Sequence, residues 1–148
     1  MLETYAGDVK VVYKNFPLPG HRYARAAAAA ALAAEMQGEF WAFHDLLFLN
    51  YRQIDLPKIM EIARDLSLDQ QRLFRDMNAA GVITAIDRDV RERLRIGVNS
   101  TPSVFINGRL LRNRSFARFQ ADIENILDKL DHGAAISLSD AADDISDR

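Results

Sequence analysis

The chain has 148 residues, with 19 Lys and Arg against 21 Asp and Glu, so its net charge is −2 with neutral histidines. This length suits one domain with a proper core, and the weakly acidic balance argues against a nucleic-acid-binding protein. The sequence contains no cysteine, which excludes disulfides, thiol chemistry and thiolate metal sites within these residues. The alanine-rich run 26–34 is too short to span a bilayer, and the residues after Met1 do not read as a signal peptide.

The first element expected is a β-strand over residues 8–16, DVKVVYKNF. Val9, Val11 and Tyr13 alternate there, and the prolines and glycine of PLPG (17–20) end the run. The residues before it, MLETYAG, resemble the last turn of a helix that ends at Gly7.

Residues 21–50 have a helical pattern built on an alanine run, with an interruption expected near Gly38, because glycine is unfavourable inside a helix. The second half of this segment, FWAFHDLLFL, is rich in aromatic residues. We expect these side chains, Trp41 and Phe48 included, to form part of the core.

Three further amphipathic helices are expected over 55–68, 69–80 and 82–96. Asp55 and Asp69 are predicted to be the N-cap residues of the first two. The residues expected to face inward on the last two are Leu73, Phe74, Met77, Val82, Ile86, Val90 and Leu94. The remaining charged residues of the last helix, Asp89 among them, are expected to form a solvated face.

The stretch GVNSTPSVFINGRLL then predicts a β-hairpin, since Asn-Gly is a strong signal for a tight turn. Its strands are expected over 103–107 and 109–112. The periodicity of SFARFQADIENILDKL predicts a final helix over 115–130. The acidic residues 131–148 are expected to be a flexible tail or a short extension of it.

The order strand, helices, hairpin, helix indicates an α/β domain. The motifs VKVVYKNFPLPGH, GEFWAFHDLLF and GVNSTPSVFINGRLL, in this order, resemble the DsbA-like thioredoxin family. Members are thiol–disulfide oxidoreductases with a helical insertion in a thioredoxin fold. The resemblance covers residues 1–130, with the insertion at about 21–96.

The resemblance gives a role to Thr101 and Pro102. The residues alone favour an ordinary trans proline that starts a strand. The resemblance implies instead a cis-proline beside the active site, where the backbone of Thr101 pairs with an extended peptide or protein substrate.

The family's catalytic C-x-x-C follows a first, central strand, and neither has a counterpart in these residues. We therefore expect the C-terminal part of such an oxidoreductase, incomplete in its sheet and in most of the active-site helix, with no catalytic residue of its own. Its unpaired strand edges would need covering, for instance in a homodimer. The alternative is a non-catalytic thioredoxin-like module for peptide binding or oligomerisation.

No cofactor or metal site is expected, because the three histidines, His21, His44 and His132, are scattered along the chain. We interpret His21 as a turn residue and His44 as a residue at the edge of the core. Members of the family usually work in the periplasm or elsewhere outside the cytoplasm, where disulfides persist.

Overall fold

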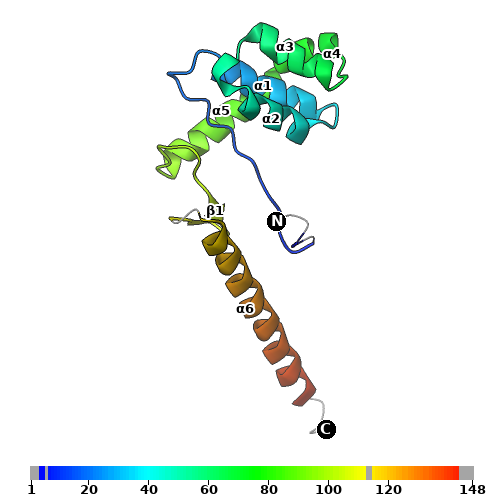
Figure 1. Cartoon of the computed structure of the whole chain (residues 1–148). Coiled ribbons are helices and arrows are strands. Elements are labelled where there is room, and N and C mark those ends of the chain that lie inside the picture. The colour runs from blue at the N-terminus through cyan, green and yellow to red at the C-terminus, as the bar shows by residue number, and fades with distance from the viewer. Residues whose placement is uncertain (1–3, 6, 113–114, 144–148) are drawn as a thin grey trace. The chain divides into compact units, whose positions relative to one another are not determined.

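The computed structural model describes residues 4, 5, 7–112 and 115–143, and of residues 131–143 it describes the backbone. The chain divides into two compact units. We call residues 13–99 the helical unit, and residues 1–12 with 100–148 the terminal unit. Figure 1 shows the helices of the first and the hairpin and long helix of the second.

The helical unit contains five α-helices and one short 3₁₀ helix. In chain order they are α1 (Ala24–Glu35), α2 (Phe40–Leu49), η1 (Tyr51–Gln53), α3 (Leu56–Asp65), α4 (Gln70–Met77) and α5 (Ala80–Arg95). The predicted interruption near Gly38 is confirmed: this residue lies between α1 and α2 with φ +84°, a left-handed conformation that glycine adopts without steric cost.

Side chains fix the starts of α3 and α4. Asp55 accepts a hydrogen bond from the backbone N of Lys58 at 2.8 Å, and Asp69 accepts one from that of Arg72 at 2.9 Å. Both predicted N-caps are thus confirmed. Helix α3 is shorter than the sequence predicted, since Ser67 turns left-handed with φ 57° and ends it.

The core of the helical unit joins the alanine-rich face of α1 to one face of every other α-helix. Its fully buried large side chains are Phe43, Ile59, Leu73 and Ile86. The small alanines of α1, among them Ala30 and Ala33, are completely buried and let the neighbouring helices approach closely.

Several apolar residues expected in the core are exposed instead: Trp41, Phe48, Phe74 and Leu94. Helix α2 is apolar around most of its circumference, and only one of its faces, with Phe43 and Leu47, turns inward. The prediction was also wrong for Asp89 on α5, which is buried, because its carboxylate accepts hydrogen bonds from Asn15.

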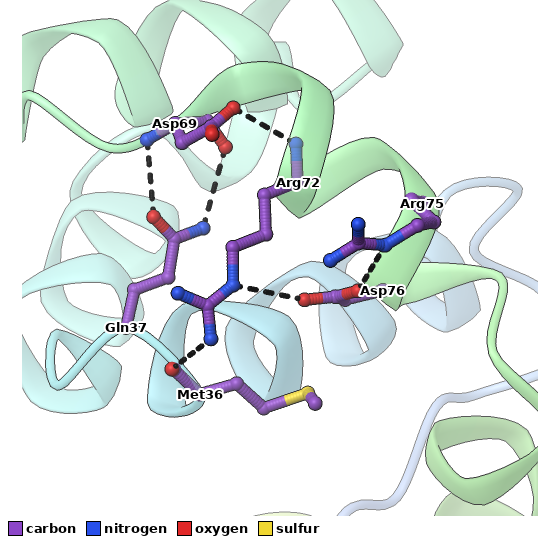
Figure 2. Close-up of polar contacts among 6 residues, drawn as sticks. All are labelled: Met36, Gln37, Asp69, Arg72, Arg75 and Asp76. Carbon is purple, nitrogen blue, oxygen red and sulfur yellow. Dashed lines mark hydrogen bonds and ion pairs between the residues drawn. The ribbon is translucent and has the colours of Figure 1, made fainter.

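A polar cluster connects the end of α1 to α4, as Figure 2 shows. The side chain of Gln37 donates a hydrogen bond to the backbone O of Asp69 at 3.3 Å and accepts one from the backbone N of Asp69 at 3.0 Å. Arg72 donates to the backbone O of Met36 at 2.9 Å and lies 3.4 Å from Asp76. These contacts satisfy backbone groups at a helix end and a helix start.

The terminal unit contains a β-hairpin and a long helix. Strands β1 (Phe105–Ile106) and β2 (Arg109–Leu110) pair antiparallel, and the predicted Asn-Gly turn is confirmed. Both turn residues have positive φ, 46° at Asn107 and 80° at Gly108, as a tight hairpin turn demands. The strands are shorter than predicted.

Helix α6 (Phe116–Asp143) begins where the sequence predicted. It continues beyond Leu130, so the first part of the acidic segment 131–148 has a helical backbone. Residues 144–148 lie outside the described part of the chain.

The strand predicted over residues 8–16 does not form. Within the described residues the only sheet is the pair β1–β2. A strand is stabilised by a ladder to a neighbour, and without one the β-rich sequence leaves Val11 and Val12 exposed. In the described residues before it, Gly7 has φ +101° and the backbone N of Val9 donates to the O of Tyr5 in a turn. The helix end predicted over residues 1–7 falls partly outside the described part of the chain.

Candidate binding site

The loop that precedes β1 carries the two residues predicted to bind substrate. Thr101 and Pro102 are both exposed, and the peptide bond between them is cis. The hydroxyl of Ser103 donates to the backbone O of Ser100 at 2.8 Å and closes the loop across these two residues. The loop therefore presents an exposed, locally constrained stretch of backbone.

The hairpin holds the end of this loop. Phe105 pairs with Leu110 and Ile106 with Arg109. Next to the Phe105–Leu110 pair, the backbone N of Leu111 donates a hydrogen bond to the backbone O of Val104 at 2.8 Å. This bond brings the backbone pairing to within two residues of Pro102.

A second candidate site is a groove of about 370 Å³ within the helical unit. It lies between the segment 13–23, helix α1 and the stretch from α2 to Ile54. Alanines of α1 form part of its wall, and its aromatic lining residues are Tyr13, Phe16, Tyr23, His44, Phe48 and Tyr51, with His21 also present. None of the lining residues is acidic.

Tyr13 connects the two sides of the groove. Its ring centroid lies 4.9 Å from that of His44 and 5.5 Å from that of Phe40, in edge-on and tilted arrangements that aromatic pairs prefer. Burial raises the pKa of the Tyr13 hydroxyl above its ordinary value. The Nδ1 atom of His44 lies 3.0 Å from a carboxylate oxygen of Asp45, which fixes the orientation of the ring.

The segment that carries Tyr13 is fixed to α5 by a buried carboxylate. Asp89 accepts hydrogen bonds from the backbone N of Asn15 at 2.9 Å and from its Nδ2 at 3.1 Å. Lys14 donates to Glu92 at 2.9 Å. The Arg93 guanidinium lies 3.7 Å from the centroid of the Phe16 ring, a cation–π distance.

The structure brings His21 and His44 together on one groove, although the sequence placed them separately as a turn residue and a core-edge residue. In the sequence, the two histidines stand in the motifs FPLPGH and FHDLLF. Neither motif indicates that the two segments lie close together in the fold. Among the residues that the structure describes, no group of three or more His, Cys, Asp or Glu could hold a metal ion.

None of the described helices has the length and the apolar character needed to cross a membrane.

A family model described as Thioredoxin matches residues 1–125. The chain belongs to the thioredoxin family. The crystal structure of a thioredoxin-like oxidoreductase from Silicibacter pomeroyi DSS-3 aligns with a TM-score of 0.66 and 30% identity, covering 80% of this chain and 68% of that one. The thioredoxin-like resemblance and fold predicted from the sequence are thereby confirmed.

Curated relatives of this thioredoxin-like chain are named as transporters. A protein named Na(+)/H(+) antiporter NhaA from Herminiimonas arsenicoxydans is 32% identical over 114 residues, which cover 77% of this chain and 18% of that protein. A protein named Na(+)/H(+) antiporter NhaA 3 from Salinispora tropica is 37% identical over 106 residues, which cover 69% of this chain and 16% of that protein. The chain thus spans less than a fifth of the length of these relatives.

Proposed function

We propose that this chain is the C-terminal part of a DsbA-like thiol–disulfide oxidoreductase and that it supplies the peptide-binding side of the active site. In this proposal the backbone at Thr101 pairs with an extended polypeptide, as in β-strand addition. The thiols that exchange with the polypeptide's disulfide come from outside these 148 residues, which contain no cysteine.

The observation that supports the proposal most strongly is the match to thioredoxin over residues 1–125, which includes the exposed Thr101–Pro102 loop. The structural neighbour is itself described as an oxidoreductase and aligns with most of this chain. In strand addition, hydrogen bonds between main chains provide the affinity, so a protein that binds a peptide in this way needs an accessible backbone edge. Thr101 and the first residue of β1, Phe105, are both exposed, which supports this role.

The origin of the thiols can be tested by reading the genomic DNA upstream of the Met1 codon in the same frame. The proposal expects codons for a β-strand followed by C-x-x-C. Its first thiol would be activated by the N-terminus of the helix that follows, because a thiolate rather than a thiol attacks disulfides. An in-frame stop codon preceded by a promoter would remove the catalytic part of the proposal.

A non-catalytic module is the second candidate, and the absence of cysteine from the sequence favours it. Such a module would bind extended peptides through the same loop, or would oligomerise through its strand edges, without exchanging disulfides. Sedimentation distinguishes these two uses. A dimer that dissociates when β1 is disrupted favours oligomerisation, whereas a monomer that binds peptide favours recognition.

A further inference from the structure

The tight turn of the hairpin contains two neighbouring residues that can react with each other. Asn107 is followed by Gly108, and both are exposed. Within the described residues the side-chain amide of Asn107 makes no hydrogen bond, whereas the amides of Asn15, Asn50 and Asn78 each donate one. The carbonyl carbon of the Asn107 side chain, Cγ, is therefore accessible to a nucleophile.

The backbone N of Gly108 is the nucleophile next to this carbon along the chain. It donates no hydrogen bond within the described residues, and it lies outside both strands. A Cβ atom at position 108 would meet no heavy atom within 4 Å beyond the neighbouring residues, so nothing packs against the glycine. Because glycine has no side chain to hinder its own nitrogen, attack on Cγ can close a five-membered ring.

The turn must open before this ring closes. It holds Asn107 in a left-handed conformation, with φ 46°, and ring closure needs rotation of the backbone away from it. Little opposes this opening, since β1 and β2 have two residues each and three of these four residues are exposed. A two-stranded hairpin with so little packing is marginally stable in water, so local opening costs little free energy.

We propose that Asn107 is a site of spontaneous deamidation, in which the backbone N of Gly108 displaces the side-chain amide as ammonia. The bond from this nitrogen to Cγ forms, the bond from Cγ to Nδ2 breaks, and the proton of the backbone N leaves with the ammonia. Water then opens the cyclic imide at either of its two carbonyl carbons and leaves aspartate or isoaspartate at position 107. The reaction goes beyond the proposed function, because neither a peptide ligand nor a thiol takes part.

Isoaspartate changes the hairpin more than aspartate does. Its main chain runs through Cβ, which adds one atom to a turn that joins the paired residues Ile106 and Arg109. Because turn length sets the register of a hairpin, the longer turn separates the backbone groups that pair next to it. The hydrogen bond from Leu111 N to Val104 O reports this loss of pairing.

The test incubates the intact, folded chain at mildly alkaline pH and follows each asparagine by peptide mapping and mass spectrometry. Asn107 is expected to convert, with both aspartate and isoaspartate as products. The chain unfolded in urea gives the reference rate, and the folded chain is expected to react within about tenfold of it, because opening costs little.

Two other asparagines serve as controls in the same sample. Asn99 is the matched one, because it is exposed and its amide makes no hydrogen bond within the described residues, but Ser100 follows it. Since the side chain of serine hinders the attacking nitrogen, Asn99 is expected to convert about tenfold more slowly than Asn107. Asn78, whose amide donates to the backbone O of Phe74, is expected to be slower still.

Two variants separate the parts of the inference. Asn107→Gln keeps a side-chain amide but would have to close a six-membered ring, so it is expected to stay unmodified over the same time. Freshly purified Asn107→Asp carries the added charge without the added main-chain atom. Its Leu111 amide is expected to exchange hydrogen within about twofold of wild type, and that of the purified isoaspartate form about tenfold faster.

Three results would overturn the inference: no product at position 107 in the folded chain while the unfolded chain converts, conversion of Asn99 or Asn78 as fast as that of Asn107, or aspartate as the sole product. The last would indicate direct attack of water on the side chain. Equal exchange at Leu111 in Asn107→Asp and in the isoaspartate form would contradict the effect on the register. None of these measurements uses a peptide ligand, so failure of the proposed function at Thr101 stays distinguishable.

Discussion

Replacing Asp89 by alanine tests whether one buried carboxylate fixes the 13–17 segment to α5. Asp89 and Asn15 are each 5% exposed, and two hydrogen bonds of 2.9 and 3.1 Å join them. A hydrogen bond to a charged acceptor contributes about 1.5–3 kcal/mol, and a buried donor left unpaired costs about 1–3 kcal/mol. The second carboxylate oxygen, Oδ1, makes no hydrogen bond within the described residues, but it lies 3.5 Å from the Nζ atom of Lys14.

We therefore expect Asp89→Ala to lower the free energy of unfolding of the helical unit by about 2–4 kcal/mol. Asp89→Asn retains an acceptor for the Asn15 backbone and is expected to cost about 1 kcal/mol. The assay is urea unfolding followed by the fluorescence of Trp41. The ring of Trp41, on α2, has its centroid 6.4 Å from that of Tyr13, which belongs to the 13–17 segment. A lower midpoint with an unchanged slope would identify a change in stability.

Asp87→Ala is the matched control, because Asp87 lies two positions before Asp89 on the same helix and forms an ion pair with Arg25 at the surface. Such an exposed pair contributes about 0–1 kcal/mol. If Asp89→Ala cost no more than Asp87→Ala, the buried hydrogen bonds would not be what holds the segment, and the reasoning would be refuted.

Three further predictions concern local structure. Asp55→Ala removes the acceptor that lies 2.8 Å from the Lys58 backbone N and is expected to cost about 1 kcal/mol in urea unfolding. The hydrogen bond from Arg75 lowers the pKa of Asp76 below its ordinary value of 3.8. Ionised Asp76 therefore stabilises the fold above that value, and the stabilisation is lost as the pH falls through the lowered pKa. The difference in melting temperature between wild type and Asp76→Asn should be full at neutral pH and disappear in strong acid. Gly108→Ala forces a side chain into φ 80°, which costs about 1–2 kcal/mol and should speed hydrogen exchange at the backbone amide of Leu111.

Each of these has a result that contradicts it. Asp55→Ala should cost more than Asp65→Ala, an exposed position at the other end of the helix, and equal costs would deny the cap. A melting difference for Asp76→Asn that stayed constant with pH would show that its charge does not matter. Asn107→Gly keeps the left-handed turn accessible, so exchange as fast as in Gly108→Ala would disprove the conformational explanation.

Local signals in the sequence predicted the features that local chemistry determines. The starts of α3 and α4 were predictable from Asp55 and Asp69, since a short acceptor before an amphipathic run satisfies the first backbone donors of a helix. The hairpin was predictable from Asn107 and Gly108, because few other residue pairs adopt the required positive φ. In these places the side chain and the backbone that it controls lie within a few residues.

Features that depend on distant segments were not predictable. The 8–16 segment has the composition of a strand, but a strand needs a neighbour to pair with, and composition does not supply one. The burial of Asp89 depends on Asn15, which is 74 positions away in sequence. The groove likewise needs the 13–23 segment to meet α2, and neither segment alone contains a signal for the other.

Binding of an extended, cysteine-free peptide at Thr101 tests the proposed function most directly. It should be measured by amide NMR in the Phe48→Ser background, so that the groove of the helical unit does not contribute. Thr101→Val preserves the backbone N–H and is expected to bind within about twofold of its parent, whereas Thr101→Pro removes that donor and should weaken binding about tenfold. Equal affinities for the valine and proline variants would contradict strand addition at this loop.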